Sequence, residues 1–134
     1  MRKITHDICE ALQSGTPCTR SNTYTDGTKV FLHNNLIAFK RDNGISISLA
    51  GWPTPTTRER INGLLKYFYE NDHIRIYQKQ GDQYISTKRG DAQIFDHCFY
   101  GLRHKKGEIR ITDQGLIPEA EIDCFIPSVK RRVL

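Results

Sequence analysis

The sequence predicts an α+β fold, in which a small antiparallel sheet is covered on one face by an amphipathic helix and is followed by a strand-rich C-terminal extension. Residues 45–50 (ISISLA) alternate apolar and small side chains, as expected for a strand with one apolar face. The segment at about 57–69 has the i, i+3, i+4, i+7 spacing of a single helical stripe, formed by Ile61, Leu64, Leu65 and Phe68. We therefore expect this helix to lie across the sheet.

The elements before this helix follow from local signals. Residues 4–13 have helical spacing, and Gly15 and Pro17 end that helix. The Asp26-Gly27 pair predicts a turn. Tight turns at Asn34-Asn35 and at residues 42–44 then separate three predicted antiparallel strands, which are residues 29–33, 36–41 and 45–52.

After the helix, the pattern predicts a hairpin and then becomes weaker. Residues 74–78 and 83–87 alternate as strands and are linked by Lys79 to Asp82 around Gly81. Further on, residues 93–102 fit a strand or a loop, and two later segments resemble strands, residues 108–112 and 121–128. The sequence therefore predicts a core at residues 1–86 and an extension at residues 87–134 that packs on it.

Composition favours a folded protein with an anionic partner. The chain has 134 residues, a formal net charge of +5 and a pI near 9.1. No apolar run approaches the roughly 20 residues that span a bilayer, so no membrane association is expected. The four cysteines have irregular spacings without a CxxC pair, which is typical of thiols in a reducing compartment.

The start of the second helix, GWPTPTTRERING at residues 51–63, combines hydroxyl and guanidinium groups. Thr56 and Glu59 have the spacing of a capping box, and Trp52 offers a ring that would lock this corner on the core. Cations at a helix start are disfavoured by roughly 0.3–1 kcal/mol each, which invites a compensating anion. Besides the purely structural cap, the segment therefore predicts a phosphate site, formed by Thr56, Thr57, Arg58 and Arg60.

Two further groups of residues are candidate contacts for a base or another ligand. His33 and Asn35 lie at the end of a predicted strand, beside the Trp52 corner, although Asn34-Asn35 is equally the chemistry of a hairpin turn. On the later hairpin, Tyr77 and Tyr84 would stack bases while Lys79 holds phosphate, or the two rings would complete the rim of the core.

Other chemistry has no support in the sequence. Histidine and cysteine residues do not have the spacing of structural zinc sites, and neither GxGxxG nor GxxxxGK[ST] is present. His97 and Cys98 are adjacent, which would place them on opposite faces of a strand and argues against a catalytic dyad. We therefore expect no metal, no cofactor and no catalytic residue.

Four blocks, in order, resemble a group of small uncharacterised proteins of tailed bacteriophages. The blocks are NTYT at 22–25, LHNNLIA at 32–38, LAGWPTPTTRERING at 49–63 and IYQKQGDQYI at 76–85. The phage pattern is NT, LHGNxIA, GWxTxTTxxRxN and QKxGxWYL, from which Asn34 and Gln83-Tyr84 depart. The resemblance covers residues 22–85 and implies a phage origin and a non-essential, early, host-directed role.

These observations together favour a non-enzymatic phage accessory protein, for host takeover or anti-defence, that binds nucleic acid or a nucleotide. A second hypothesis is an anti-defence protein that docks on a host defence protein or sequesters a cyclic nucleotide messenger, as a homo-oligomer built through strand edges. A third is a minor virion component. In each case we expect the protein in the cytoplasm of the infected bacterial host.

Overall fold

The computed structural model describes residues 1–41, 44–69, 73–87, 90–105 and 108–111. These residues form two helices, α1 (Lys3–Ser14) and α2 (Pro55–Phe68). They also form ten strands: β1 (Cys18–Arg20), β2 (Thr23–Thr25), β3 (Lys29–Leu32), β4 (Asn35–Arg41), β5 (Gly44–Ile47), β6 (Arg75–Lys79), β7 (Asp82–Thr87), β8 (Gly90–Ile94), β9 (Tyr100–Lys105) and β10 (Glu108–Ile111).

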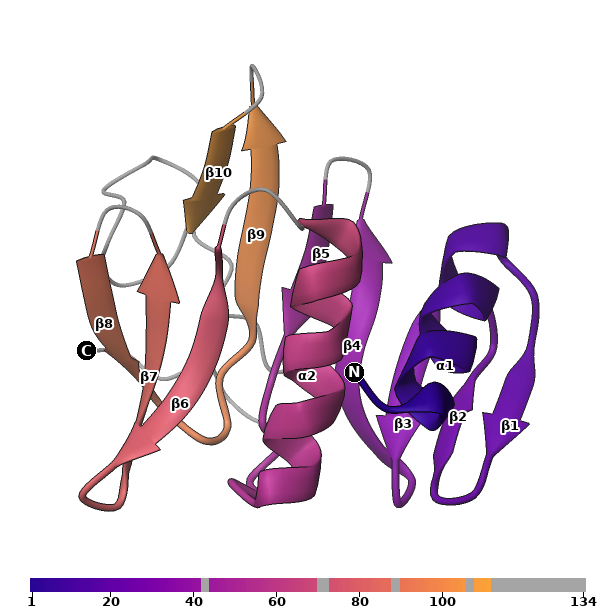
Figure 1. The fold of residues 1–134 in the computed structure, drawn as a ribbon, viewed down its shortest axis with the longest axis horizontal. Helices are drawn as coiled ribbons and strands as arrows, with labels where there is room; N and C mark the ends of the chain where they lie inside the picture. Colours follow the sequence, from indigo (N-terminus) through magenta and orange to yellow (C-terminus); the bar gives the residue numbers. More distant parts are fainter. Residues whose placement is uncertain (42–43, 70–72, 88–89, 106–107, 112–134) are drawn as a thin grey trace.

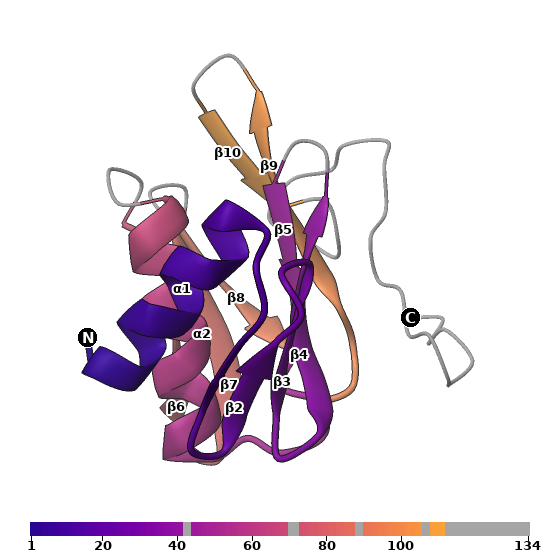
Figure 2. The ribbon, with the colours of Figure 1, turned by 90° about the vertical axis from the view of Figure 1, so that its right-hand side faces the viewer.

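The strands make two antiparallel sheets. The larger has the order β1-β2-β3-β4-β5-β9-β10, and the smaller has the order β6-β7-β8. Figure 1 shows α2 between the smaller sheet on one side and α1 on the other. In Figure 2 both helices lie on the same side of strands β2 to β5. The predicted α+β class, with an antiparallel sheet and a covering helix, is confirmed.

Helix α2 buries the apolar stripe that its spacing predicts. Ile61, Leu64 and Leu65 are at most 1% exposed and join one core with Ile37 and Ile47 of the large sheet. Burial of such side chains is worth roughly 1.5–3 kcal/mol each, so this stripe fixes α2 on the sheet. Two serines on the other face of β5 and just after it, Ser46 and Ser48, are also buried, whereas the alternation predicts a polar face there.

Strands beyond residue 87 belong to both sheets. β8 pairs with β7, and β9 pairs with β5, which places Leu102 opposite Ile45. The Tyr69 hydroxyl at the end of α2 accepts from the Ile45 amide and donates to the Leu102 carbonyl, both at 2.9 Å. Residues 90–105 thus meet the predicted core by strand pairing. The strand predicted at 121–128 lies outside the described residues.

Three details differ from the sequence-based expectation. Strands β1 and β2 were not expected, because CTR and TYT carry no apolar alternation. The smaller sheet is separate from the larger one, although the sequence suggested a single sheet. Helix α2 starts at Pro55, two residues before the expected start, because Thr54 supplies its cap.

Candidate ligand pocket

A pocket of about 490 Å³ lies where the β3–β4 turn, the end of β5 and the start of α2 meet. These segments lie at the lower end of the large sheet in Figure 1. The volume is in the range of small-molecule sites. Its lining comprises Leu32, His33, Asn35, Ile37, Leu49, Ala50, Trp52, Thr54, Thr56 and Thr57. Five residues predicted as ligand contacts are therefore brought together here, namely His33, Asn35, Trp52, Thr56 and Thr57.

The cap of α2 is formed by Thr54, so the predicted capping box at Thr56 and Glu59 is wrong. The Thr54 Oγ1 atom accepts from the Thr57 amide at 3.1 Å, and Pro55 occupies the first helical turn. The Thr54 and Thr57 hydroxyl oxygens are also 2.9 Å apart and share a hydrogen bond. Thr57 is 1% exposed, so its hydroxyl serves the cap and is not available to a ligand.

Thr56 is the part of this first turn that remains available. The first amides of a helix have no partner within the helix. Pro55 has no amide, and the amides of Thr57 and Arg58 both bond to Thr54. Among the described residues, this leaves the Thr56 amide and hydroxyl as first-turn donors beside the pocket.

The β3–β4 turn forms one wall of the pocket. His33 and Asn34 both have left-handed backbone, with φ of 50° and 67°, as in the type I′ turns that suit hairpins. The turn is therefore one residue earlier than predicted, and Asn35 is the first residue of β4, paired with Leu32. The His33 amide donates to the Asn22 carbonyl at 2.9 Å, which fixes this wall.

Trp52 forms an exposed rim above an apolar floor. Its side chain is 58% exposed, so it does not lock the corner on the core as the structural alternative required. Leu32, Ile37 and Leu49 below it are each at most 4% exposed. A large exposed indole over a buried apolar floor offers a flat surface to an aromatic ligand.

Arg60, which the sequence predicts as a phosphate contact because a cation at a helix start invites an anion, is buried and already has an anionic partner. Its side chain is 3% exposed and pairs with the Glu59 carboxylate. Its Nε donates to Thr23 Oγ1 at 2.9 Å, its Nη1 also donates to Thr5 Oγ1, and its Nη2 donates to Asn22 Oδ1. The Glu59 carboxylate also accepts from Thr5 Oγ1 at 2.7 Å. Arg60 thus joins α2 to α1 and β2 and does not line the pocket.

Arg58 also lies outside the pocket lining. Its Nη1 donates to the Pro53 carbonyl at 2.9 Å and to the side-chain oxygens of Gln78 and Gln83 at 3.2 and 3.1 Å. Gln83 is 2% exposed and is held in turn by Gln78. This half-buried guanidinium therefore connects the start of α2 to the β6–β7 hairpin.

The hairpin residues Tyr77, Tyr84 and Lys79 form a separate surface. The two rings are a cross-strand pair with centroids 5.4 Å apart, and the Arg75 guanidinium lies 5.0 Å from the Tyr77 centroid. The Tyr77 hydroxyl donates to Asp91, which raises the pKa of Tyr77 and lowers that of Asp91. Two cations and two carboxylates, Arg75, Lys79, Asp82 and Asp91, balance one another on these strands.

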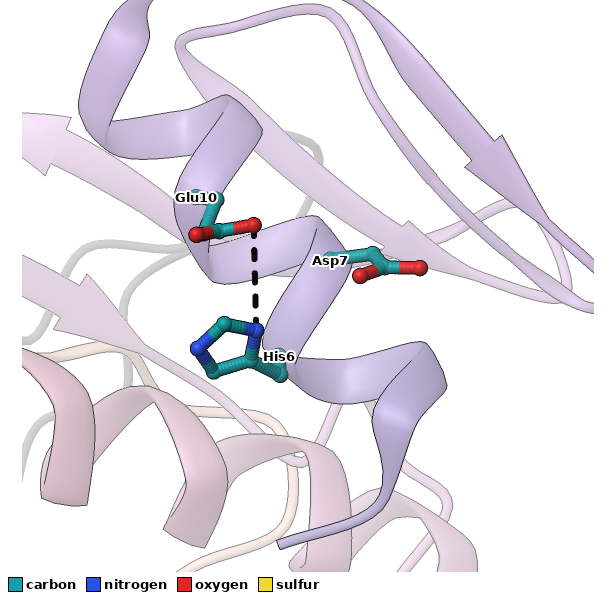
Figure 3. Close-up of side chains that lie close together, drawn as sticks. All are labelled: His6, Asp7 and Glu10. Atoms are coloured by element: carbon teal, nitrogen blue, oxygen red, sulfur yellow. Dashed lines mark ion pairs between the residues drawn. The ribbon is translucent and has the colours of Figure 1, made fainter.

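One group of potential metal ligands is found on α1. One potential ligand atom from each of His6, Asp7 and Glu10 lies within 4.8 Å of the other two. Figure 3 shows His6 paired with Glu10, at 3.7 Å, and the Asp7 carboxylate turned away from that pair. The Asp7 carboxylate accepts from Arg20 at 3.0 Å, and this bond together with nearby Lys3 lowers the pKa of Asp7. The carboxylate of Asp7, the third potential metal ligand, is therefore already paired with Lys3 and Arg20.

A model of a protein family matches residues 1–109, and its description is Kyanoviridae Gp96 protein. The chain belongs to the Kyanoviridae Gp96 family. Membership in this family supports the resemblance to phage proteins, and the four-block motif itself stays a prediction. No curated protein and no solved structure matches the chain. None of the described helices has the length and apolar character that crossing a membrane requires.

The sequence missed the pocket floor and the cap. The sequence predicts Leu32, Ile37 and Leu49 only as strand residues. A strand pattern shows which side chains share a face, but it does not show that a pocket lies beside them. Thr54 could have been found, because a proline is common at the first helical position and the residue before it is then the cap. That rule places the cap at Thr54 before Pro55.

Proposed function

We propose that this Kyanoviridae Gp96 family protein is a non-enzymatic phage accessory protein that binds a small phosphate-bearing ligand, of nucleotide size, in the pocket beside Trp52. One observation carries the proposal: the exposed indole and the free first-turn donors of Thr56 line the same pocket. A nucleotide requires both a stacking surface and an anion site. We further propose that the purpose is host takeover or anti-defence.

The base would lie against Trp52. Stacking of a base on an aromatic ring is worth about 1–3 kcal/mol. The apolar floor excludes water from the other side, and polar groups of His33 and Asn35 at the wall offer donors and acceptors to base edges. This division of labour, with an apolar surface and a few polar groups, is usual for small-molecule sites.

The phosphate would lie at Thr56. The start of a helix carries about half a positive charge and presents amides to an anion. The Thr56 hydroxyl adds a second donor on the same residue. In this proposal Thr56 has the phosphate-binding role that the sequence predicts, whereas the Thr57 hydroxyl and Arg60 have partners within the fold.

A nucleotide fits better than a nucleic acid strand. Nucleic acid affinity depends on cations that replace the counterions of phosphates. The three strands β6, β7 and β8 together carry two cations and two carboxylates, and the Tyr77 and Tyr84 rings stack on each other. Where the structure describes the chain, the pocket lining also has no carboxylate, cysteine or lysine, which supports a binding function without catalysis.

Calorimetry with matched aromatic variants tests the proposal. We expect purine nucleotides to bind the wild-type protein, and Trp52→Ala to weaken binding by roughly 10-fold or more through loss of stacking. Tyr24→Ala removes another exposed ring, 41% exposed on β2 and outside the pocket, and should leave affinity unchanged. Absence of binding to any nucleotide, or equal losses in both variants, would contradict the proposal.

A further inference from the structure

We infer that the pocket selects a nucleotide whose phosphate carries a single negative charge, such as a cyclic phosphodiester, over nucleoside diphosphates and triphosphates. The inference rests on the proposed function and deepens it. It follows from the charge of the lining residues, from the hydrogen bonds and ion pair that already engage Arg58 and Arg60, and from the size of the pocket.

Among the described residues, the pocket lining has anion donors but no fixed cation. The ten lining residues within the described part of the chain include no lysine and no arginine, and His33 is the one titratable side chain among these ten. The two arginines of the helix start are directed elsewhere. Arg60 is buried with Glu59, and Arg58 is bound to Pro53 and to the hairpin glutamines.

The positive potential at the phosphate position is therefore small. It comes from the start of α2, equivalent to about half an elementary charge, and from the neutral donors of Thr56. Together, these groups partly neutralise a single negative charge on the ligand. A phosphomonoester carries about two charges at neutral pH, and each further phosphate adds to this. Moving each additional negative charge from water into the pocket costs free energy, because no cation in the described lining pairs with it. The pocket therefore disfavours polyphosphates.

The size of the pocket agrees with one nucleotide. A volume of about 490 Å³ is in the lower half of the range for drug-sized ligands. The base and sugar would occupy the space between Trp52 and the apolar floor, and a phosphate closed on its own sugar would reach Thr56 without a chain of further phosphates. A compact monoanion matches both the volume and the charge.

A charge series tests this inference with the intrinsic fluorescence of Trp52, which is the single tryptophan of the chain. The probes are adenosine, cyclic 3′,5′-AMP, AMP and ATP, together with the guanine equivalents, at constant ionic strength and without divalent metal. For at least one base we expect the cyclic nucleotide to bind most tightly, with AMP weaker and ATP weaker by about tenfold or more.

A pair of lysine variants completes the test. Thr56→Lys places a cation at the phosphate position and should shift the ratio of affinities toward ATP by about tenfold. Tyr24→Lys adds the same charge on β2, outside the pocket, and should leave the ratio unchanged. A shift of equal size in both variants would mean that overall charge sets the preference, and it would overturn the inference.

The outcomes separate the inference from the proposed function. ATP binding as tightly as the cyclic nucleotide overturns the inference and leaves the proposed function in place. If adenosine binds as tightly as every phosphorylated form, the pocket does not recognise the phosphate. If none of the probes binds, the pocket is not a nucleotide site. Either of these two results overturns the proposed function, and the inference with it.

Discussion

Replacement of Arg60 with methionine should destabilise the protein by about 3 kcal/mol, because it leaves a partly buried carboxylate without its partner. The side chain of Glu59 is 27% exposed and that of Arg60 is 3% exposed, so both charges lie largely away from water. Loss of one member of a buried pair costs about 3–5 kcal/mol, and the residual exposure of Glu59 favours the lower end. Methionine keeps most of the packing of the arginine stem.

The double variant Glu59→Gln with Arg60→Met provides the control. It removes both charges and keeps an oxygen that accepts from Thr5, so much of the lost stability should return. Urea unfolding followed by circular dichroism measures both variants. The folded Arg60→Met protein should bind nucleotide as the wild type does, since Arg60 does not line the pocket. A cost below about 1 kcal/mol without rescue would refute the buried-pair reasoning.

Three other expectations follow from the described contacts. Burial raises the pKa of Glu59, but hydrogen bonds from Thr5, Arg60 and the Arg2 amide outweigh burial and lower the pKa below 4.5. The free energy of unfolding should therefore fall as the pH drops through the lowered pKa, which urea midpoints measured against pH would show. A flat profile would contradict this expectation. A Cβ at Gly63 would lie 2.2 Å from the Thr5 methyl, so Gly63→Ala should lower the free energy of unfolding in urea by about 1–3 kcal/mol. Adding Thr5→Ser removes that methyl and should restore stability. A double variant as unstable as Gly63→Ala would refute the contact. Burial raises the pKa of the Cys9 thiol to about 12, so iodoacetamide should modify Cys9 only in the unfolded protein, as measured by mass spectrometry. Modification of Cys9 in the native protein would contradict its burial.

The strong periodic signals of the sequence predicted the main elements. The stripe of α2 and the hairpin around Gly81 are present as expected, since each depends on neighbours along the chain. The pairing of β9 with β5 could not be predicted, because it joins residues more than 50 positions apart and local periodicity carries no information about such partners. The same limit explains why two sheets were taken for one.

The site shows the same division between local and distant information. Trp52, His33 and Thr56 were predicted from residue chemistry near a strand-to-helix corner, and the fold brings them to one pocket. Arg60 was misjudged for a different reason. A charge at a helix start was assumed to need an external anion, whereas the partner of Arg60 is the preceding residue, Glu59, which is held by Thr5 of α1.

Chemical-shift mapping of ¹⁵N-labelled protein tests the central claim most directly, because it locates the bound ligand. Titration with cyclic 3′,5′-AMP or cyclic 3′,5′-GMP should shift the Thr56 amide, the Trp52 indole and the backbone at His33, with small changes elsewhere. Shifts that gather on Tyr77 and Tyr84, or a spectrum that both nucleotides leave unchanged, would contradict a nucleotide site at the start of α2.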